Sequence, residues 1–175
     1  MELRTAERSD IPALASLIEL SGRALSVGHY SPEQADAITR HVFGVDTQLI
    51  DDGTFFVIEH DDRIVACGGW SRRRTLFGGD QTKAGPDPLL DPAIEPARIR
   101  AFFVHPSMAR RGLGRQLMAA CMAASNDAGF RALELVATVP GEPLYLASGF
   151  TVLERFELEL PGGVAVPVSR MRMNI

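Results

Sequence analysis

The fold is decided by residues 102–115, which read Phe102-Phe103-Val104-His105-Pro106-Ser107-Met108-Ala109-Arg110-Arg111-Gly112-Leu113-Gly114-Arg115. An apolar strand is expected up to Val104, followed by a short turn and by two glycines that open a helix. Backbone N–H groups at a helix start have no intrahelical partner, and glycine lets an anion approach them closely. The neighbouring arginines can add charge-assisted hydrogen bonds. The segment therefore predicts a site for an anion such as a phosphate.

Two better-known phosphate motifs do not fit this segment. A P-loop needs Gly-Lys-Ser/Thr after its spaced glycine, and a dinucleotide-binding Gly-x-Gly-x-x-Gly would have its third glycine where Leu117 stands. A structural alternative stays open, in which Gly112 and Gly114 only let the helix pack closely against a strand.

The flanking patterns predict alternating strands and helices. Ser31 to Gln34 have the form of a capping box, and Gly22 is expected to end the helix that begins after Asp10. Residues 75–96 are rich in Gly, Pro and Asp and are expected to form an irregular excursion. Strands are expected over residues 2–6, 55–58, 64–70, 99–104, 132–138, 152–160 and 166–173, with two further helices over 111–128 and 142–148.

Composition and charge narrow the class of protein. A length of 175 residues and 46% hydrophobic residues suit one domain over residues 1–175. The net charge of −4 argues against a nucleic-acid partner, although Arg72 to Arg74 form either a local anion site or a solvated loop. Cys67 and Cys121 are expected to be buried thiols, and His and Cys show no spacing typical of metal ligands. No apolar run is long enough for a membrane helix, so a cytoplasmic location is expected by default.

Two motifs resemble those of the GNAT superfamily of N-acetyltransferases. Residues 109–114 are similar to its acetyl-CoA motif, Q/R-x-x-G-x-G/A, except that Ala109 replaces the usual Gln or Arg. Residues 144–150, Leu-Tyr-Leu-Ala-Ser-Gly-Phe, resemble its Phe/Leu-Tyr-x-x-x-Gly-Phe signature. The resemblance implies a mixed α/β (α+β) fold, with a mostly antiparallel central sheet flanked by helices. It implies that this sheet is splayed between strands 99–104 and 132–138, where acetyl-CoA enters as co-substrate without a metal.

The resemblance also assigns roles to single residues. Tyr145 would protonate the departing thiolate of coenzyme A, unless it is only a core aromatic. Backbone N–H groups near Val104 would polarise the acetyl carbonyl. The residues expected to bind the cofactor are Phe103, Val104, Arg110, Arg111, Gly112, Leu113, Gly114, Arg115 and Thr138.

The acceptor side is less determined by the sequence. Arg98 and Arg100 stand where the family often has a catalytic base, yet arginine cannot accept a proton. We expect at least one of them to face the acceptor and to favour one that bears a carboxylate; alternatively, they are exposed or pair with acidic residues of the excursion. Tyr30 is a candidate contact to the acceptor or part of a surface turn, and Glu142, His29 or Tyr30 could supply a base.

The expected activity is transfer of an acetyl group from acetyl-CoA to a primary amine of a small molecule. A protein or peptide acetyltransferase and an acyl-CoA sensor without turnover are the rival hypotheses. Neither a nucleic-acid nor a membrane partner is expected, and a homodimer is possible since many members of the superfamily are dimers.

Overall fold

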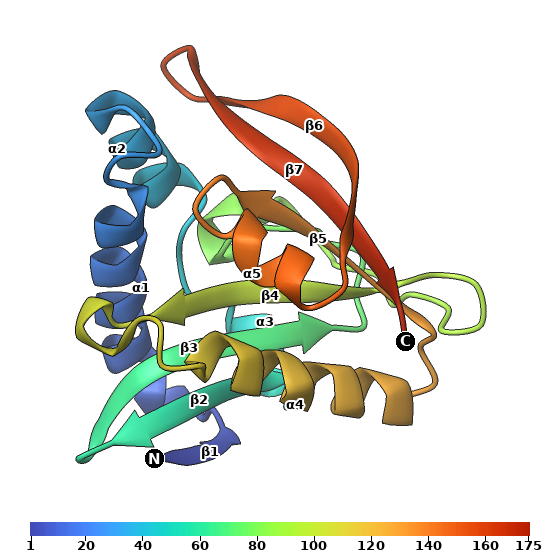
Figure 1. The fold of residues 1–175 in the computed structure, drawn as a ribbon. Helices are drawn as coiled ribbons and strands as arrows, with labels where there is room; N and C mark the ends of the chain where they lie inside the picture. Colours follow the sequence, from blue (N-terminus) through green and yellow to red (C-terminus); the bar gives the residue numbers. More distant parts are fainter.

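The computed structural model describes residues 1–175, which form a seven-stranded sheet flanked by helices (Figure 1). The strands follow the order β1-β2-β3-β4-β5-β7-β6. They are β1 (Glu2–Thr5), β2 (Phe55–His60), β3 (Arg63–Ser71), β4 (Ala97–Val104), β5 (Ala132–Thr138), β6 (Thr151–Leu160) and β7 (Val164–Asn174). The helices are α1 (Ile11–Ser26), α2 (Pro32–His41), α3 (Thr47–Asp51), α4 (Leu113–Asp127) and α5 (Glu142–Ala147). The expected mixed α/β fold with a mostly antiparallel sheet is confirmed.

The two halves of the sheet meet at its one parallel pairing, between β4 and β5. Only Ala97 with Leu133 and Arg98 with Glu134 are paired there, whereas every other neighbouring pair of strands is antiparallel. Beyond these pairs the two strands separate, leaving Ile99–Val104 of β4 and Leu135–Thr138 of β5 unpaired with each other. We call this gap the β4–β5 opening, and it is the splay that the resemblance implied.

Helices cover both faces of the sheet because successive strand residues point to opposite sides. Phe55 and Val57 pack with Leu14 and Ile18 of α1. Ile58, next along the same strand, packs instead on the opposite face, in the cluster formed by α4 residues Leu113 and Leu117. The sequence thus places α1 and α2 on one face and α4 on the other, as Figure 1 shows.

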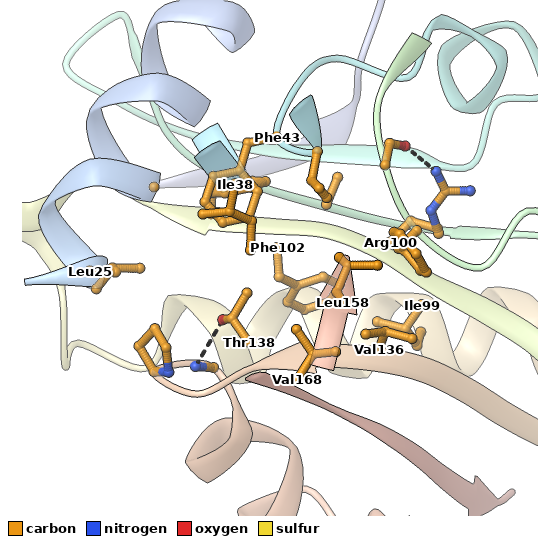
Figure 2. A pocket seen from close by; sticks show the side chains of 18 of the residues that line it. Leu25, Ile38, Phe43, Ile99, Arg100, Phe102, Val136, Thr138, Leu158 and Val168 are labelled. Carbon is orange, nitrogen blue, oxygen red and sulfur yellow. Dashed lines mark hydrogen bonds between the residues drawn. The ribbon is translucent and has the colours of Figure 1, made fainter. Parts of the chain in front are cut away.

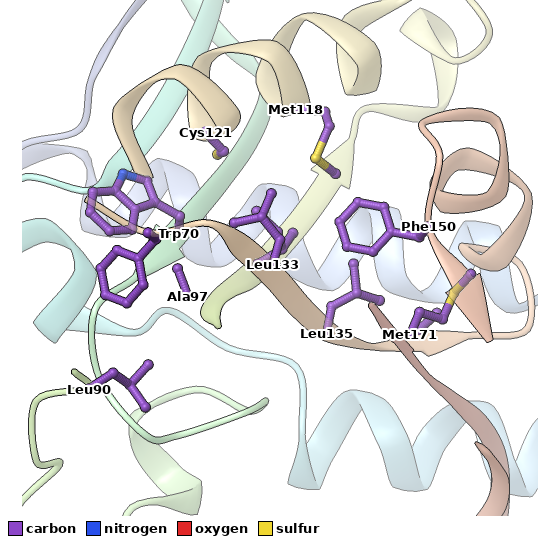
Figure 3. Packing of buried hydrophobic residues seen from close by; sticks show 12 residues of the cluster. Trp70, Leu90, Ala97, Met118, Cys121, Leu133, Leu135, Phe150 and Met171 are labelled. Carbon is purple, nitrogen blue, oxygen red and sulfur yellow. The ribbon is translucent and has the colours of Figure 1, made fainter. Parts of the chain in front are cut away.

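The largest core cluster lies between α4 and the centre of the sheet (Figure 3). Cys121 and Met118 of α4 face Leu133 and Leu135 of β5, and all four side chains are buried. Burial raises the pKa of the Cys121 thiol above its usual range and that of Cys67 to about 12. Both cysteines are unpaired thiols buried in apolar surroundings, as predicted.

Local sequence patterns predicted most helix boundaries correctly, with two exceptions. The capping box is confirmed, since Ser31 Oγ accepts from the Gln34 N–H and Gln34 Oε1 accepts from the Ser31 N–H, each at 3.1 Å. Gly22 does not end α1, which continues to Ser26; a Cβ at Gly22 would lie 2.5 Å from the Phe43 ring, so glycine is needed there for packing. The short helix α3 was not predicted. None of the helices combines the length and apolar character needed to cross a bilayer.

Candidate functional site

A bulge in β4 shapes the β4–β5 opening. Between the pairs Cys67 with Phe103 and Gly69 with Arg100, β4 contains one residue more than β3. Ala101 takes up this extra residue with a φ of +55°, a conformation that non-glycine residues rarely adopt. The bulge alters the alternation of β4 within the opening, so Phe102 joins the α4 face and Phe103 the α1 face.

A cavity of about 130 Å³ passes through this opening. On the α4 face it is lined by Phe102 and Tyr145, and on the opposite face it extends to α1 and α2. Figure 2 shows apolar side chains from several elements converging on it. The side chains labelled there are Leu25, Ile38, Phe43, Ile99, Arg100, Phe102, Val136, Thr138, Leu158 and Val168.

The turn before α4 presents unpaired backbone donors. No N–H group from Arg110 to Arg115 has a hydrogen-bond partner in the protein. Arg110 and Gly112 have positive φ values of 64° and 84°, and such alternating conformations turn successive N–H groups toward one point. Arg110, Arg111 and Arg115 are exposed and form no ion pair. The turn therefore offers unpaired N–H donors to a ligand, with three guanidinium groups beside it that form no ion pair.

The two glycines of this turn do different things. A Cβ at Gly112 would meet nothing within 4 Å, so the space above this residue is open to a ligand, while its φ favours glycine. A Cβ at Gly114 would lie 3.0 Å from Leu144 Cδ2, so this glycine allows α5 to approach α4. The phosphate interpretation thus fits Gly112, and the packing alternative describes Gly114.

Tyr145 is held by aromatic contacts and leaves its hydroxyl free. Its ring lies edge-on to Phe102 at 6.1 Å and to Phe150 at 5.9 Å between centroids. The hydroxyl has no hydrogen-bond partner in the protein, and Tyr145 is one of the residues that line the cavity. Burial of the ring, with a smaller contribution from Cys121, raises the pKa of Tyr145 above its usual range. At neutral pH this side chain therefore keeps its proton.

The end of β4 and the end of β5 hold the other expected cofactor contacts. Phe103 and Thr138 both line the cavity, and Thr138 Oγ1 accepts from the Gly141 N–H at 3.3 Å. The Val104 N–H, expected to polarise the acetyl carbonyl, instead donates to Ser21 Oγ of α1 at 3.2 Å. The N–H of Val104 itself is thus engaged, and polarisation of the carbonyl by a backbone N–H near Val104 stays a prediction for its neighbours.

Arg100 is a buried structural residue, contrary to the expectation that it binds an acceptor carboxylate. Its side chain is 2% exposed, and its guanidinium donates to Asp46 Oδ2 at 2.9 Å, to the Thr75 carbonyl at 3.0 Å and to the Gly78 carbonyl. Figure 2 marks the bond to the excursion with a dashed line. Both terminal nitrogens of the guanidinium are thus engaged in holding Asp46 and residues 75–78, which leaves no parallel pair of donors for a carboxylate.

Arg98, unlike Arg100, does not line the cavity. Its guanidinium lies 3.8 Å from Glu134, its partner on β5, and burial lowers its pKa. Glu134 also interacts with Arg170 of β7 at 3.5 Å. The expectation of a carboxylate-binding arginine is thus wrong at both positions, because strand pairing and the excursion supply acidic or carbonyl partners.

The arginine run 72–74 is structural too. Arg73 binds both carboxylate oxygens of Asp52 at 2.7 and 2.9 Å, and Arg74 lies 3.2 Å from Glu95. The Arg72 guanidinium lies over the Trp70 ring, 5.3 Å from its centroid. Arg73 and Arg74 therefore have carboxylate partners, and Arg72 packs on an aromatic ring.

The remaining residues expected on the acceptor side either have hydrogen-bond partners within the protein or lie outside the cavity. Tyr30 is 7% exposed; its hydroxyl donates to the Pro167 carbonyl at 2.8 Å and accepts from the Val139 N–H at 2.9 Å. The hydrogen bond from Ser169, together with Arg155, lowers the pKa of Glu142, which makes it a poor base. His29 is exposed and does not line the cavity. Tyr30 therefore connects its own loop to Val139 and Pro167 by hydrogen bonds, and it does not contact a ligand.

The walls of the cavity on the α1 and α2 side were not found from sequence. They are apolar side chains without a motif, and they come together only through packing of distant segments. Amphipathic patterns predicted that Ile38 and Val42 would be buried, but no pattern indicated that they line a cavity with Leu158 and Val168.

Comparisons with known proteins agree with this geometry. The family described as "Acetyltransferase (GNAT) domain" matches residues 51–152, which is more than half of the chain. The chain therefore belongs to the GNAT acetyltransferase family, as the two motifs indicated. A comparison with curated protein sequences found no match.

Solved structures with the same fold cover almost the whole chain. A GCN5-related N-acetyltransferase from Rhodopseudomonas palustris is 17% identical with a TM-score of 0.71, over 99% of this chain and 95% of that one. The PaiA N-acetyltransferase of Thermoplasma acidophilum, in complex with coenzyme A, is 13% identical with a TM-score of 0.66, over 99% and 98%. A ribosomal-protein-alanine N-acetyltransferase from Brucella melitensis is 13% identical with a TM-score of 0.64, over 100% of both chains. At these identities the likeness establishes the fold.

Proposed function

We propose that this protein transfers an acetyl group from acetyl-CoA to the primary amine of a small molecule, with Tyr145 as the proton donor. The observation that carries the proposal is the free hydroxyl of Tyr145 at a cavity that opens between β4 and β5. Membership in the GNAT family and the coenzyme A bound to the Thermoplasma acidophilum structure support acetyl-CoA as co-substrate.

The unpaired donors before α4 fit the pyrophosphate of this co-substrate. The N–H groups from Arg110 to Arg115 would hold the phosphate oxygens, with the three exposed arginines adding charge. The open space above Gly112 would let the phosphates reach the backbone. The pantetheine arm would lie along Phe103 and Val104, with Thr138 on the opposite strand.

Acetyl-CoA supplies the acetyl group as a thioester. In the transfer, a bond forms between the amine nitrogen and the carbonyl carbon, and the bond from that carbon to sulfur breaks, leaving its electron pair on sulfur. Tyr145 would give its proton to the thiolate and be reprotonated by the proton that the attacking amine loses. Its raised pKa keeps the hydroxyl protonated before each transfer, so it acts as an acid and not as a base.

Substitution of each tyrosine by phenylalanine tests this role. Tyr145→Phe keeps the contacts with Phe102 and Phe150 and removes only the hydroxyl, so we expect kcat to fall by about 10²–10⁴. Acetyl-CoA affinity and thermal stability should change little. Tyr30→Phe is the matched control, since Tyr30 does not itself line the cavity; the change deletes two structural hydrogen bonds and should lower Tm while retaining turnover. Release of free coenzyme A measures kcat for both variants. An unchanged kcat in Tyr145→Phe would make Tyr145 a core residue.

The rival functions differ in turnover and acceptor size. A sensor would bind acetyl-CoA without releasing coenzyme A in the presence of any amine. A peptide acetyltransferase would use peptide N-termini better than small amines. A homodimer stays a prediction, which light scattering of the purified protein would measure.

A further inference from the structure

The cavity contains no acidic or basic group that could recognise or deprotonate an ammonium ion. No Asp, Glu, His or Lys lines it. Of its polar side chains, Ser26 donates to the Gly22 carbonyl at 2.7 Å and Thr138 accepts from the Gly141 N–H. Arg100 donates to Asp46 and to two carbonyls of the excursion. None of these groups can take a proton from an ammonium ion at neutral pH, and the raised pKa of Tyr145 keeps its hydroxyl protonated.

The walls beyond the β4–β5 opening are apolar. They are formed by α1 and α2, by the first residues of the excursion and by β6 and β7, and they include Leu25, Ile38, Val42, Phe77, Leu158 and Val168. Leu25 is 40% exposed, so the apolar lining continues to the protein surface. This is the side opposite the anion site, from which an acceptor would have to enter.

An ammonium ion would be unfavourable in this cavity for two reasons. Burial of a charge without a partner costs far more than burial of a neutral amine, since lost hydration is not replaced. In addition, the only charged side chain in the wall, Arg100, is itself a cation. An acceptor that is protonated in solution would therefore have to lose its proton before entry, without help from the protein.

The size of the cavity suits a single ring. Its volume of about 130 Å³ is shared with the thioester end of acetyl-CoA, so the walls leave room for no more than a single ring, since an apolar cavity of roughly 150 Å³ in another protein admits benzene. We propose that the acceptor is a weakly basic amine on an apolar, ring-sized body, such as an aromatic amine, whose nitrogen is uncharged at neutral pH. This inference rests on the proposed function and specifies its acceptor class.

Aniline and cyclohexylamine are a matched pair of probes. They have similar size, but aniline is neutral at pH 7.5, since its lone pair is delocalised into the ring, whereas cyclohexylamine is a cation. We expect aniline to have a kcat/KM at least about 100-fold higher at pH 7.5. Raising the pH toward 9 should leave aniline unchanged and increase turnover of cyclohexylamine in proportion to its neutral fraction. Release of coenzyme A can be followed with a thiol reagent, because both cysteines are buried.

A carboxylate placed in the wall should reverse part of this preference. Leu76 lines the cavity from the excursion, outside the sheet and the helices, and is only half-buried. In Leu76→Glu the preference for aniline should narrow by about tenfold, because an ammonium ion gains a partner. Leu76→Gln, with the same shape and no charge, should not narrow it. Thermal unfolding of both variants verifies that the fold is retained.

Several outcomes would overturn the inference while leaving the proposed function intact. These are equal or better use of cyclohexylamine at pH 7.5, and preferential use of carboxylate-bearing or polycationic amines. Faster turnover of octanoyl-CoA than acetyl-CoA would overturn both the inference and the proposed acetyl transfer, since the cavity would then be an acyl-chain site. If no amine releases coenzyme A, the proposed function fails. Calorimetry of aniline and cyclohexylamine with the coenzyme A complex then still tests the inference, and tighter binding of aniline would support it.

Discussion

Asp46 joins three parts of the protein, and removing its charge should be costly. Its side chain is 1% exposed and contacts Arg100 of β4 and Lys83 of the excursion. Asp46 Oδ1 also accepts from the Gln48 N–H at 3.1 Å and thereby caps α3. Burial lowers the pKa of Arg100, and the Asp46 carboxylate is the largest influence that opposes this. The pair therefore keeps a buried guanidinium charged beside the cavity.

Asp46→Asn retains the shape and the cap of α3 but leaves Arg100 without its counter-ion. Loss of one partner of a buried ion pair costs about 3–5 kcal/mol. For a protein of this size each kcal/mol lowers Tm by about 2–4 °C, so the expected decrease is roughly 6–20 °C. Because Arg100 also holds the carbonyls of Thr75 and Gly78, the excursion should become more susceptible to proteolysis as well.

Differential scanning calorimetry at pH 7 measures this effect, and Asp36→Asn is the matched control. Asp36 also contacts two cations, Arg23 and Arg40, but all three side chains are about half exposed or more, and exposed pairs contribute about 0–1 kcal/mol. A decrease in Tm below 2 °C for Asp46→Asn, or equal decreases in both variants, would refute the argument that the buried pair holds the cavity wall.

Three further predictions concern the anion site and acid stability. In Gly112→Ala the new residue must adopt a φ near +84° or reorient the turn, which costs about 1–2 kcal/mol. Calorimetry should therefore show a roughly 5–30-fold weaker acetyl-CoA Kd. An unchanged Kd would contradict the phosphate assignment. Gly114→Val should lower kcat in addition to affinity, because the new side chain displaces Leu144 next to Tyr145; a loss confined to affinity would argue against this coupling. Arg4 and Arg73 lower the pKa values of Asp10 and Asp52, so their stabilisation is complete above the usual carboxylate pKa of about 4 and is lost as the pH falls through the lowered values. Tm should thus be flat above about pH 5 and fall below about pH 4, with a weaker acid dependence in Asp52→Asn; an equally steep dependence in that variant would exclude Asp52 as a cause.

The sequence was informative where a structure depends on neighbouring residues. The capping box at Ser31 and the glycines before α4 both form within a few residues of chain, so their sequence patterns are sufficient to predict them. The two family motifs added the position of Tyr145 and the opening of the sheet. The five-residue helix α3 is shorter than the window in which periodicity can be recognised.

Long-range partners could not be predicted in this way. Arg100 lies 54 residues from Asp46 and Tyr30 lies 137 residues from Pro167, so no local pattern indicates that either side chain is already committed. Likewise, Gly22 resembles a helix stop until Phe43 is seen against it. The prediction that an arginine contacts the acceptor was wrong for the same reason. The position of a residue on a strand indicates which face its side chain points to, but not whether a carboxylate or carbonyl already binds that side chain.

The β4–β5 opening makes the stability of the protein a function of ligand concentration. With only two paired residues on each strand, the halves β1–β4 and β5–β7 share few backbone hydrogen bonds, and the ladder groups that face the opening have no partner strand. A molecule that bridges them acts as a replaceable strand, and at 100 times its Kd it adds about 2.7 kcal/mol to the free energy of unfolding. Amide hydrogen exchange should then slow most along Ile99–Val104 and Leu135–Thr138, the two segments that the ligand joins.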